Sequence, residues 1–320
     1  MIRVYRFHGI TISVDSDDSP IPEIFEKLFG LEPVKQKIGK TRISLIFRRR
    51  DKKDPVKLPK TIVDKIRLIR ESNIKGFFDG RKLLLTDFKS TVEINYHENS
   101  ALFFLDPSML KYEKLFSHTL LPLTVAELLK KYGFYYVHAS CADIGGKGVL
   151  FLGGPGAGKS TSCYSLVRSG AKWVSDDAVL IRRRGKNVFA YSFMKEFSLK
   201  SEQRSPFIEL RKIKGKKDKI ELGNINLIRS SFELRTNPKI AVLLHGETGT
   251  PTTSFSRVSR SSLLSNIISE NPFIFLNRRS SGKILSDLTK LGRQCNIMIL
   301  KDKELVLDSE KFKTSISNFF

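Results

Sequence analysis

A chain of 320 residues with 40% hydrophobic side chains is long enough to bury one large core or two ordinary ones, which excludes a wholly disordered protein. Its 56 Lys and Arg against 33 Asp and Glu give a net charge of +23, which favours an acidic partner such as nucleic acid, an anionic membrane surface or an acidic peptide. Because the basic residues are spread along the chain, solvated charge without any partner is an equally good interpretation.

The sequence also limits the compartment. No apolar run is long enough to cross a bilayer, and residues 1–18 lack the apolar segment and cleavage site of a secretory signal. Three widely spaced cysteines, Cys141, Cys163 and Cys295, form neither a metal-binding cluster nor a disulfide framework. We therefore expect reduced thiols, a cytoplasmic location and no membrane span.

Residues 1 to about 110 contain short runs with strand character, separated by Gly, Asn, Asp and Pro. The runs lie at 5–14, 41–50, 80–88, 91–97 and 101–107. The segment IPEIFEKLFG interrupts them and predicts one short helix that ends at Gly30. We predict a β-rich N-terminal domain over residues 1–115.

From Ser117 the pattern changes to alternating helices and strands. Residues 117–133 carry apolar side chains at helical spacing and stop at Gly133. The remaining predicted elements are two strands within 134–144 and 147–154 joined by a tight turn, a helix at 159–170, strands at 172–184, 187–193 and 239–247, and a helix at 259–269. This order predicts an α/β domain over residues 116–320, with a mixed central sheet flanked by helices and a C-terminal strand-helix tail.

Residues 153–160 fit the phosphate-loop pattern G-x-x-x-x-G-K-[ST] at every fixed position, between an apolar strand and a helix. Glycines let successive N–H groups converge on phosphate oxygens, and the helix offers its positive end to the anion. We expect Lys159 to reach the outer phosphates and the Ser160 hydroxyl to ligate Mg²⁺. The predicted cofactors are ATP and Mg²⁺, bound by Gly153, Gly154, Pro155, Gly156, Ala157, Gly158, Lys159, Ser160 and Thr161.

Asp176 and Asp177 follow the strand after the phosphate-loop helix, where a carboxylate commonly stands near the metal. Two carboxylates suggest that one binds Mg²⁺ while the other takes a proton from an attacking hydroxyl. Both can face the site only if the strand has ended there, because side chains alternate along a strand. A polar turn is the alternative interpretation. His138, in the strand before the loop, is by itself more often structural.

The order of histidine, strand, phosphate loop, helix and paired aspartates over residues 138–181 resembles the HPr kinase/phosphorylase family and its shorter HPr-kinase-like relatives. His138, Arg168, Gly170, Asp176 and Asp177 fall into register with the family pattern. The resemblance implies a P-loop kinase core of HPr-kinase type. It further implies that Asp176 is the general base for an acceptor serine, that His138 orients it, that Lys159 and Ser160 hold phosphate and magnesium, and that Asp177 supports the metal.

Residues 187–212 lack the glycine-rich second signature of the bifunctional enzymes, so HPr as substrate and reverse phosphorolysis are not implied. The layout is closer to HPr-kinase-like proteins, some of which phosphorylate a terminal serine of a lasso-peptide precursor. We expect an ATP-dependent serine kinase for a protein or peptide. The lysine-rich segment 211–219 is either a flap that attracts an acidic one or, equally well, a solvated loop without a role. Lys195, Lys200 and Arg204 are candidates to complete the phosphate clamp.

Three other functions stay open: a kinase for a small hydroxyl metabolite, a P-loop ATPase coupled to nucleic-acid binding, and a nucleotide-binding scaffold without catalysis. Paired acids with an upstream histidine suit hydroxyl activation better than hydrolysis, so nucleic acid is the less favoured partner. The bifunctional enzymes of the family form hexamers, which makes an oligomer an option.

Overall fold

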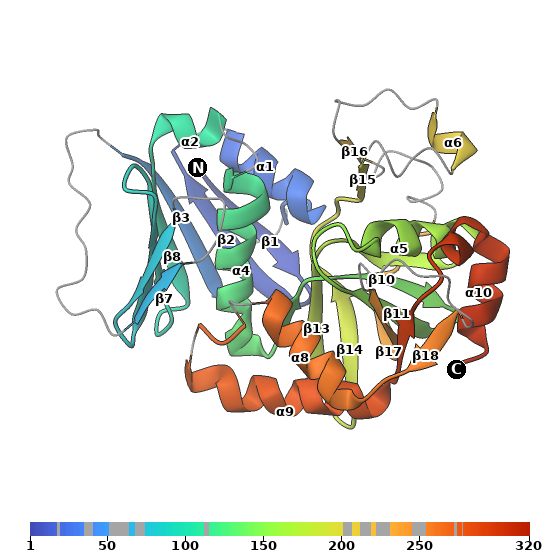
Figure 1. The fold of residues 1–320 in the computed structure, drawn as a ribbon. Helices are drawn as coiled ribbons and strands as arrows, with labels where there is room; N and C mark the ends of the chain where they lie inside the picture. The colour runs from blue at the N-terminus through green and yellow to red at the C-terminus, as the bar shows by residue number, and fades with distance from the viewer. Residues whose placement is uncertain are drawn as a thin grey trace. The chain divides into compact units, whose positions relative to one another are not determined.

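The computed structural model (Figure 1) describes residues 1–17, 20–34, 41–50, 64–67, 74–111, 115–200, 207–211, 219–221, 231–244, 254–271, 274–276 and 278–320. The chain divides into two compact units, Met1–Tyr132 and Gly133–Phe320. This division differs from the sequence-based boundary at residue 115, because helix α4 (Leu121–Leu129) lies within the first unit. No helix in the described ranges is long and apolar enough to span a membrane.

The first unit is built on an eight-stranded sheet in the order β1-β2-β3-β8-β7-β6-β5-β4. Its strands are β1 (Ile2–Phe7), β2 (Ile10–Ser16), β3 (Ile43–Arg49), β4 (Asp64–Arg67), β5 (Lys75–Phe78), β6 (Lys82–Thr86), β7 (Thr91–Asn95) and β8 (Ser100–Leu105). β3 pairs in parallel with β2 and β8, and the other neighbours are antiparallel. The expected strand-rich character of this part of the chain is therefore present.

Helices complete the first unit. They are α1 (Pro20–Phe29), α2 (Pro107–Lys111), the π-helix η1 (Phe116–Leu120), α4 and the 3₁₀-helix η2 (Lys130–Tyr132). The helix predicted to end at Gly30 is α1, and Gly30 itself has a φ of 59°, a left-handed conformation that ends helices well. α1 buries Phe25, Leu28 and Phe29. The predicted short helix is therefore present, and it is amphipathic.

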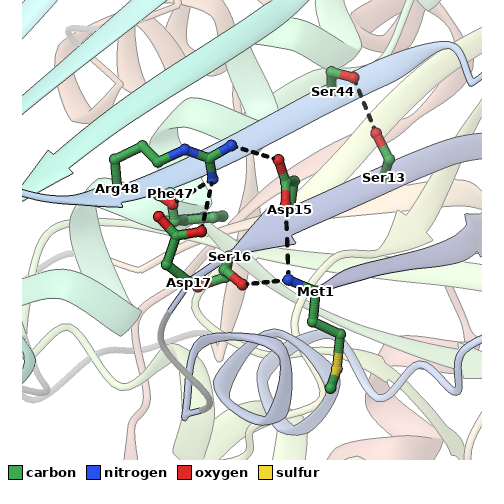
Figure 2. Close-up of polar contacts among 8 residues, drawn as sticks. All are labelled: Met1, Ser13, Asp15, Ser16, Asp17, Ser44, Phe47 and Arg48. Atoms are coloured by element: carbon green, nitrogen blue, oxygen red, sulfur yellow. Dashed lines mark hydrogen bonds and ion pairs between the residues drawn. The ribbon is translucent and has the colours of Figure 1, made fainter.

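Polar contacts fasten the first strands (Figure 2). The Arg48 guanidinium donates to an Asp15 oxygen at 2.7 Å and lies 3.6 Å from Asp17. The N-terminal ammonium of Met1 donates to the Ser16 carbonyl at 2.8 Å. These partly exposed ion pairs add little energy each, but together they tie the end of β2 to β3 and to the chain start.

The second unit contains a nine-stranded mixed sheet in the order β12-β10-β11-β17-β14-β13-β9, with β19 beside β17 and β18 beside β19. Its strands are β9 (Tyr135–Val137), β10 (Ala139–Ile144), β11 (Lys147–Leu152), β12 (Lys172–Ser175), β13 (Val179–Arg184), β14 (Asn187–Ser192), β17 (Arg235–Leu244), β18 (Phe255–Arg257) and β19 (Asn296–Leu300). β15 (Ser198–Lys200) and β16 (Lys219–Glu221) form a separate pair.

Helices cover both faces of this sheet (Figure 1). They are α5 (Lys159–Arg168), α8 (Arg260–Glu270), α9 (Arg278–Gln294), the 3₁₀-helix η5 (Glu304–Leu307) and α10 (Ser309–Ser317). The short helix α6 (Ile208–Arg211) is linked to α5 through Glu209. Phe151 of β11 packs in a cluster with residues of α5 and α10, whereas its neighbours Leu150 and Leu152 pack in another cluster with α8 and α9. Strand alternation therefore builds two cores, which confirms the expected mixed α/β architecture.

The structure differs from the sequence-based expectation in two strands. Residues 134–144 were expected as one strand, but the strand is interrupted at His138, between β9 and β10. The strand expected to end at Asp176 and Asp177 does end there, as β12, but a further strand, β13, follows it. The elements after residue 270, α9, β19 and α10, were not predicted. Arg204 and residues 212–218 lie outside the described residues, and only the backbone is described at Lys200, Arg211 and Lys219.

Candidate active site

Four strand ends meet at one edge of the second sheet. Ala139, at the start of β10, pairs with Leu152 at the end of β11. Cys141 of β10 pairs with Ser175, the last residue of β12. β17 runs parallel to β11, and Leu152 pairs with Leu243. The segments that carry His138, the phosphate loop and the paired aspartates therefore leave the sheet at the same edge.

The phosphate loop connects β11 to α5 and depends on glycine at defined points. A Cβ at Gly153 would lie 2.5 Å from the Leu244 carbonyl oxygen, so no other residue fits there. Gly156 and Gly158 have φ values of 79° and 101°, in the left-handed region that glycine adopts at low cost. Gly158 is also the N-cap of α5 and brings no side chain to the start of the helix. The loop thus leaves the positive end of α5 open to an anion.

Lys159 is buried, and its ammonium donates to the carbonyls of Gly153 at 2.8 Å and Gly154 at 3.0 Å. Burial lowers the pKa of Lys159, while the charges of Asp177, Asp176 and Glu270 act in the opposite direction. The three carboxylates therefore lie close enough to the ammonium to affect its charge.

The hydroxyl of Thr161 is buried and has no hydrogen-bond partner within the described part of the chain. An unpaired buried hydroxyl is costly, and a phosphate oxygen would satisfy it. Ser160, half-buried at the first turn of α5, is placed beside it. The loop, the buried ammonium and these hydroxyls fit a nucleoside triphosphate with Mg²⁺.

Asp176 and Asp177 lie after the end of β12, as the sequence required for both to face the site. Asp176 is 2% exposed and accepts a short hydrogen bond from the Ser140 hydroxyl. The Asp177 side chain is 62% exposed, and its backbone has a φ of 61°. The Ala178 N–H closes the turn by donating to the Asp176 carbonyl at 2.7 Å. The two carboxylates therefore occupy different environments, one enclosed and one facing solvent.

His138 occupies the interruption between β9 and β10. Its Nδ1 lies 2.8 Å from the Asp177 carbonyl oxygen and 3.4 Å from an Asp177 carboxylate oxygen. The sequence-based interpretation placed the imidazole beside Asp176. In the structure the imidazole contacts Asp177, and the Asp176 side chain turns toward Ser140.

Asn271, the C-cap residue of α8, holds the His138 segment in place. Its side-chain oxygen accepts from the His138 N–H at 2.6 Å, and its amide donates to the Ile267 carbonyl at 2.6 Å. Asn271 is 1% exposed. The C-terminal end of α8 therefore fixes the backbone position of His138, which no strand ladder supports.

Four neighbours were missed by sequence reasoning. Ser140 could have been predicted, because residues two apart in an extended segment point to the same side and Ser140 lies two residues after His138. Tyr136 lies near Asp177, since burial first and the Asp177 charge second raise the pKa of its hydroxyl. Glu270 and Asn271 are separated from the motif by about a hundred residues, and no local pattern marks them.

The predicted clamp residues are not brought to the phosphate loop by any described contact. The Lys195 ammonium lies 4.7 Å from the ring centroid of Phe232. Arg168, which the family register singled out, forms an ion pair with Glu209 at 2.8 Å, linking α5 to α6.

Comparisons with known proteins match this region. Residues 133–226 match the family model described as the HPr Serine kinase C-terminal domain. The HPr kinase/phosphorylase of Prosthecochloris aestuarii is 46% identical over 55 residues, which cover 17% of this chain and 16% of that protein. The HPr kinase/phosphorylase of Listeria welshimeri is 31% identical over 124 residues, which cover 38% and 35%. The chain thus spans 16% to 35% of the length of these curated relatives.

Among solved structures, the Hpr(Ser) kinase/phosphatase from Coxiella burnetii aligns with 57% of this chain and 95% of its own, at 12% identity and a TM-score of 0.32.

Proposed function

We propose that this chain, whose residues 133–226 belong to the HPr-kinase-like family, is an ATP- and Mg²⁺-dependent kinase that transfers the γ-phosphoryl group to a serine hydroxyl of a protein or peptide. One observation carries the proposal. A phosphate loop with a buried lysine, two carboxylates in different environments and an imidazole leave the sheet at one edge. Phosphoryl transfer needs this combination of anion binding and a proton acceptor.

The loop residues and Lys159 would hold the β- and γ-phosphates, and the Thr161 hydroxyl would donate to a phosphate oxygen. Bound Mg²⁺ would neutralise charge that develops on the transferred group. Ser160 would supply a hydroxyl ligand, and Asp176, oriented by Ser140, would supply a carboxylate.

Asp177 is the better candidate to accept the proton of the acceptor hydroxyl. A general base must reach the incoming hydroxyl, and Asp177 is exposed while Asp176 is enclosed. His138 contacts Asp177 and would orient it. The geometry therefore favours the reverse of the roles that the family resemblance implied for the two aspartates, with Asp176 on the metal side.

The acceptor class includes a terminal serine of a lasso-peptide-type precursor as well as a serine within a folded protein. A cytoplasmic location is part of the proposal, since the three cysteines are free and buried as expected for reduced thiols.

The test compares wild type with Asp177→Asn and Asp176→Asn in a mixture of ATP, Mg²⁺ and serine-containing peptides, read by mass spectrometry. Asp177→Asn should lower the rate of transfer by about 100-fold or more while nucleotide affinity stays within about 2-fold. Asp176→Asn should weaken Mg²⁺-dependent nucleotide binding. Asp17→Asn, an exposed acid of the first unit, is the matched control.

Full transfer activity in Asp177→Asn would remove Asp177 from the role of base. Steady release of phosphate by the wild type without modification of any peptide would instead identify an ATPase and overturn the kinase.

A further inference from the structure

A groove of about 790 Å³ opens beside the first half of the phosphate loop. Its walls are loop residues 154–157, the ends of β17 and β19, and one face of α8. Ser261, Ser265 and Ser269 follow one another along that face at one-turn intervals, and Glu270 closes the end nearest the loop. The α8 groove shares loop residues 154–157 and Glu270 with the site described above, while its α8 serines have no role in that site.

The α8 groove starts at the outer-phosphate end of the loop. The lysine of a phosphate loop reaches the β- and γ-phosphates, and the Lys159 ammonium lies against the carbonyls of Gly153 and Gly154. Gly154 forms part of the groove wall, and a Glu270 carboxylate oxygen lies 3.6 Å from the position of a Cβ at Gly154. The space beyond the γ-phosphate is where the acceptor hydroxyl must stand for in-line transfer.

The nucleoside would lie outside the α8 groove. The Thr161 hydroxyl, at the first turn of α5, has no partner among the described residues, so a phosphate that it bound would lead the rest of the nucleotide away from Gly154. Thr161 is not among the residues that line the α8 groove. No aromatic side chain, which would stack on a purine, lines it in the described part of the chain. The α8 groove therefore suits an acceptor better than a base.

Its length and chemistry suit an extended peptide. Ser261 and Ser269 are eight residues apart, which corresponds to about 12 Å along a helix, or three to four residues of extended chain. Serine hydroxyls both donate and accept, so they can satisfy peptide N–H and C=O groups. The Asn266 side-chain oxygen is buried and lacks a partner among the described residues, which leaves an acceptor for a peptide N–H.

The charge of the α8 groove selects among peptides. Glu270 is the charged residue in its described wall, and no lysine or arginine lines it there. A carboxylate at the end nearest the reacting phosphate disfavours acidic residues beside the acceptor serine.

We infer that the α8 groove binds the polypeptide segment that carries the acceptor serine, and that this segment is uncharged and polar rather than acidic. The inference rests on the proposed kinase function and names the substrate class of that site. It replaces the acidic peptide that the net charge of +23 suggested.

The experiment fills the α8 groove. Ser265→Phe places a bulky ring on an exposed position of the groove wall, and Ser286→Phe makes the same change on the exposed face of α9 as a matched control. Two measurements are made on each protein: the Kd of a fluorescent ATP analogue with Mg²⁺, and phosphoryl transfer to synthetic peptides with a central serine. Ser269→Phe repeats the test at a second wall position, and thermal unfolding reports whether each variant is folded.

In Ser265→Phe and Ser269→Phe we expect the KM for peptide to rise at least about 10-fold while the nucleotide Kd stays within about 2-fold. Ser286→Phe should match wild type in both. In a second arm, peptides flanked by Ser, Asn and Gly should be phosphorylated faster than peptides flanked by Asp. Glu270→Gln should raise transfer to the Asp-flanked peptides by about 3-fold or more.

A nucleotide Kd weakened 10-fold in the groove variants would assign the groove to the nucleoside and overturn the inference. Unchanged transfer and unchanged nucleotide binding would show that the groove holds neither, while leaving the kinase intact. Faster transfer to Asp-flanked peptides by the wild type would overturn the charge preference. A wild type that binds nucleotide but phosphorylates neither peptide set would overturn the proposed function itself, and with it the occupant of the groove.

Discussion

Lys130 in the first unit and Lys159 in the second are both 6% exposed, but they have different partners. The Lys130 ammonium forms an ion pair with Glu127 at 2.5 Å, and the Tyr96 hydroxyl donates to the other oxygen of that carboxylate at 2.9 Å. The Lys159 ammonium donates to two backbone carbonyls and forms no ion pair with any described residue.

A buried charge is stable when an opposite charge compensates it directly, as at Lys130. At Lys159 the nearby carboxylates act without direct contact, so part of the cost of burying the ammonium remains and its pKa is lowered. A triphosphate would provide the missing compensation. The Lys130–Glu127 pair stabilises the fold, whereas the Lys159 ammonium remains available to bind an anionic ligand.

The largest expected effect is at Lys159. Lys159→Met removes the ammonium that contacts the outer phosphates and should lower kcat/KM for transfer about 1,000-fold. The free energy of unfolding should stay the same or increase, because the cost of burying the charge disappears. Chemical denaturation and steady-state kinetics measure the two quantities, with Lys186→Met, at an exposed turn between β13 and β14, as control. A Lys159→Met variant that loses stability as well as activity would contradict the proposed difference between Lys159 and Lys130.

Lys130→Met should have the opposite profile. It leaves the Glu127 carboxylate buried with Tyr96 as its remaining partner among the described residues, which should reduce the free energy of unfolding by about 3 kcal/mol. ATP affinity, measured well below the unfolding transition, should not change. The double variant Glu127→Gln/Lys130→Met should recover most of the lost stability. A double variant as unstable as the single one would mean that the ion pair is not the cause.

Asp287 of α9 is an intermediate case and gives the smallest effect. One of its oxygens lies 3.8 Å from Arg183, and the other has no hydrogen-bond partner among the described residues. Burial raises the pKa of Asp287, against the charges of Arg183 and Lys283. The folded state therefore holds its proton to a higher pH than the unfolded chain does, so stability is lost as pH rises from the ordinary carboxyl value to the raised one.

Asp287→Asn removes this loss. The free energy of unfolding of the variant minus that of wild type should be about 1 kcal/mol larger at pH 7 than at pH 3. Denaturant unfolding at the two pH values checks it. A stability difference that does not change with pH would mean that folding does not shift the pKa of Asp287.

Much of the site could be predicted because its residues lie close together in sequence. The phosphate loop and the position of Asp176 and Asp177 after a strand end follow from local pattern, and the structure has them there. The partner of His138 did not follow. The left-handed turn at Asp177 brings its backbone oxygen and carboxylate to the imidazole and leaves Asp176 to Ser140, and no sequence pattern fixes which aspartate turns which way.

The elements that follow from local sequence pattern were predicted, whereas those that depend on contacts between distant segments were missed. α1 and the tight turn between β10 and β11 follow from amphipathic spacing and from adjacent glycines, Gly145 and Gly146, with φ values of 60° and 86°. The interruption at His138 is invisible in a run of apolar and aromatic residues, because it arises from pairing with different strands. Asn271 contributes to the site through a contact 133 residues away, which no local pattern can reveal.

The interruption at His138 has a consequence for chain length. β9 pairs with β13 while β10 pairs with β11 and β12, and a single residue separates β9 from β10. Inserting or deleting one residue there would exchange the faces of Cys141 and Ala142, which now belong to opposite cores. Substitutions at position 138 should therefore still allow the protein to fold, although they would lower activity. Insertion or deletion of a residue there would instead disrupt the pairing of the sheet.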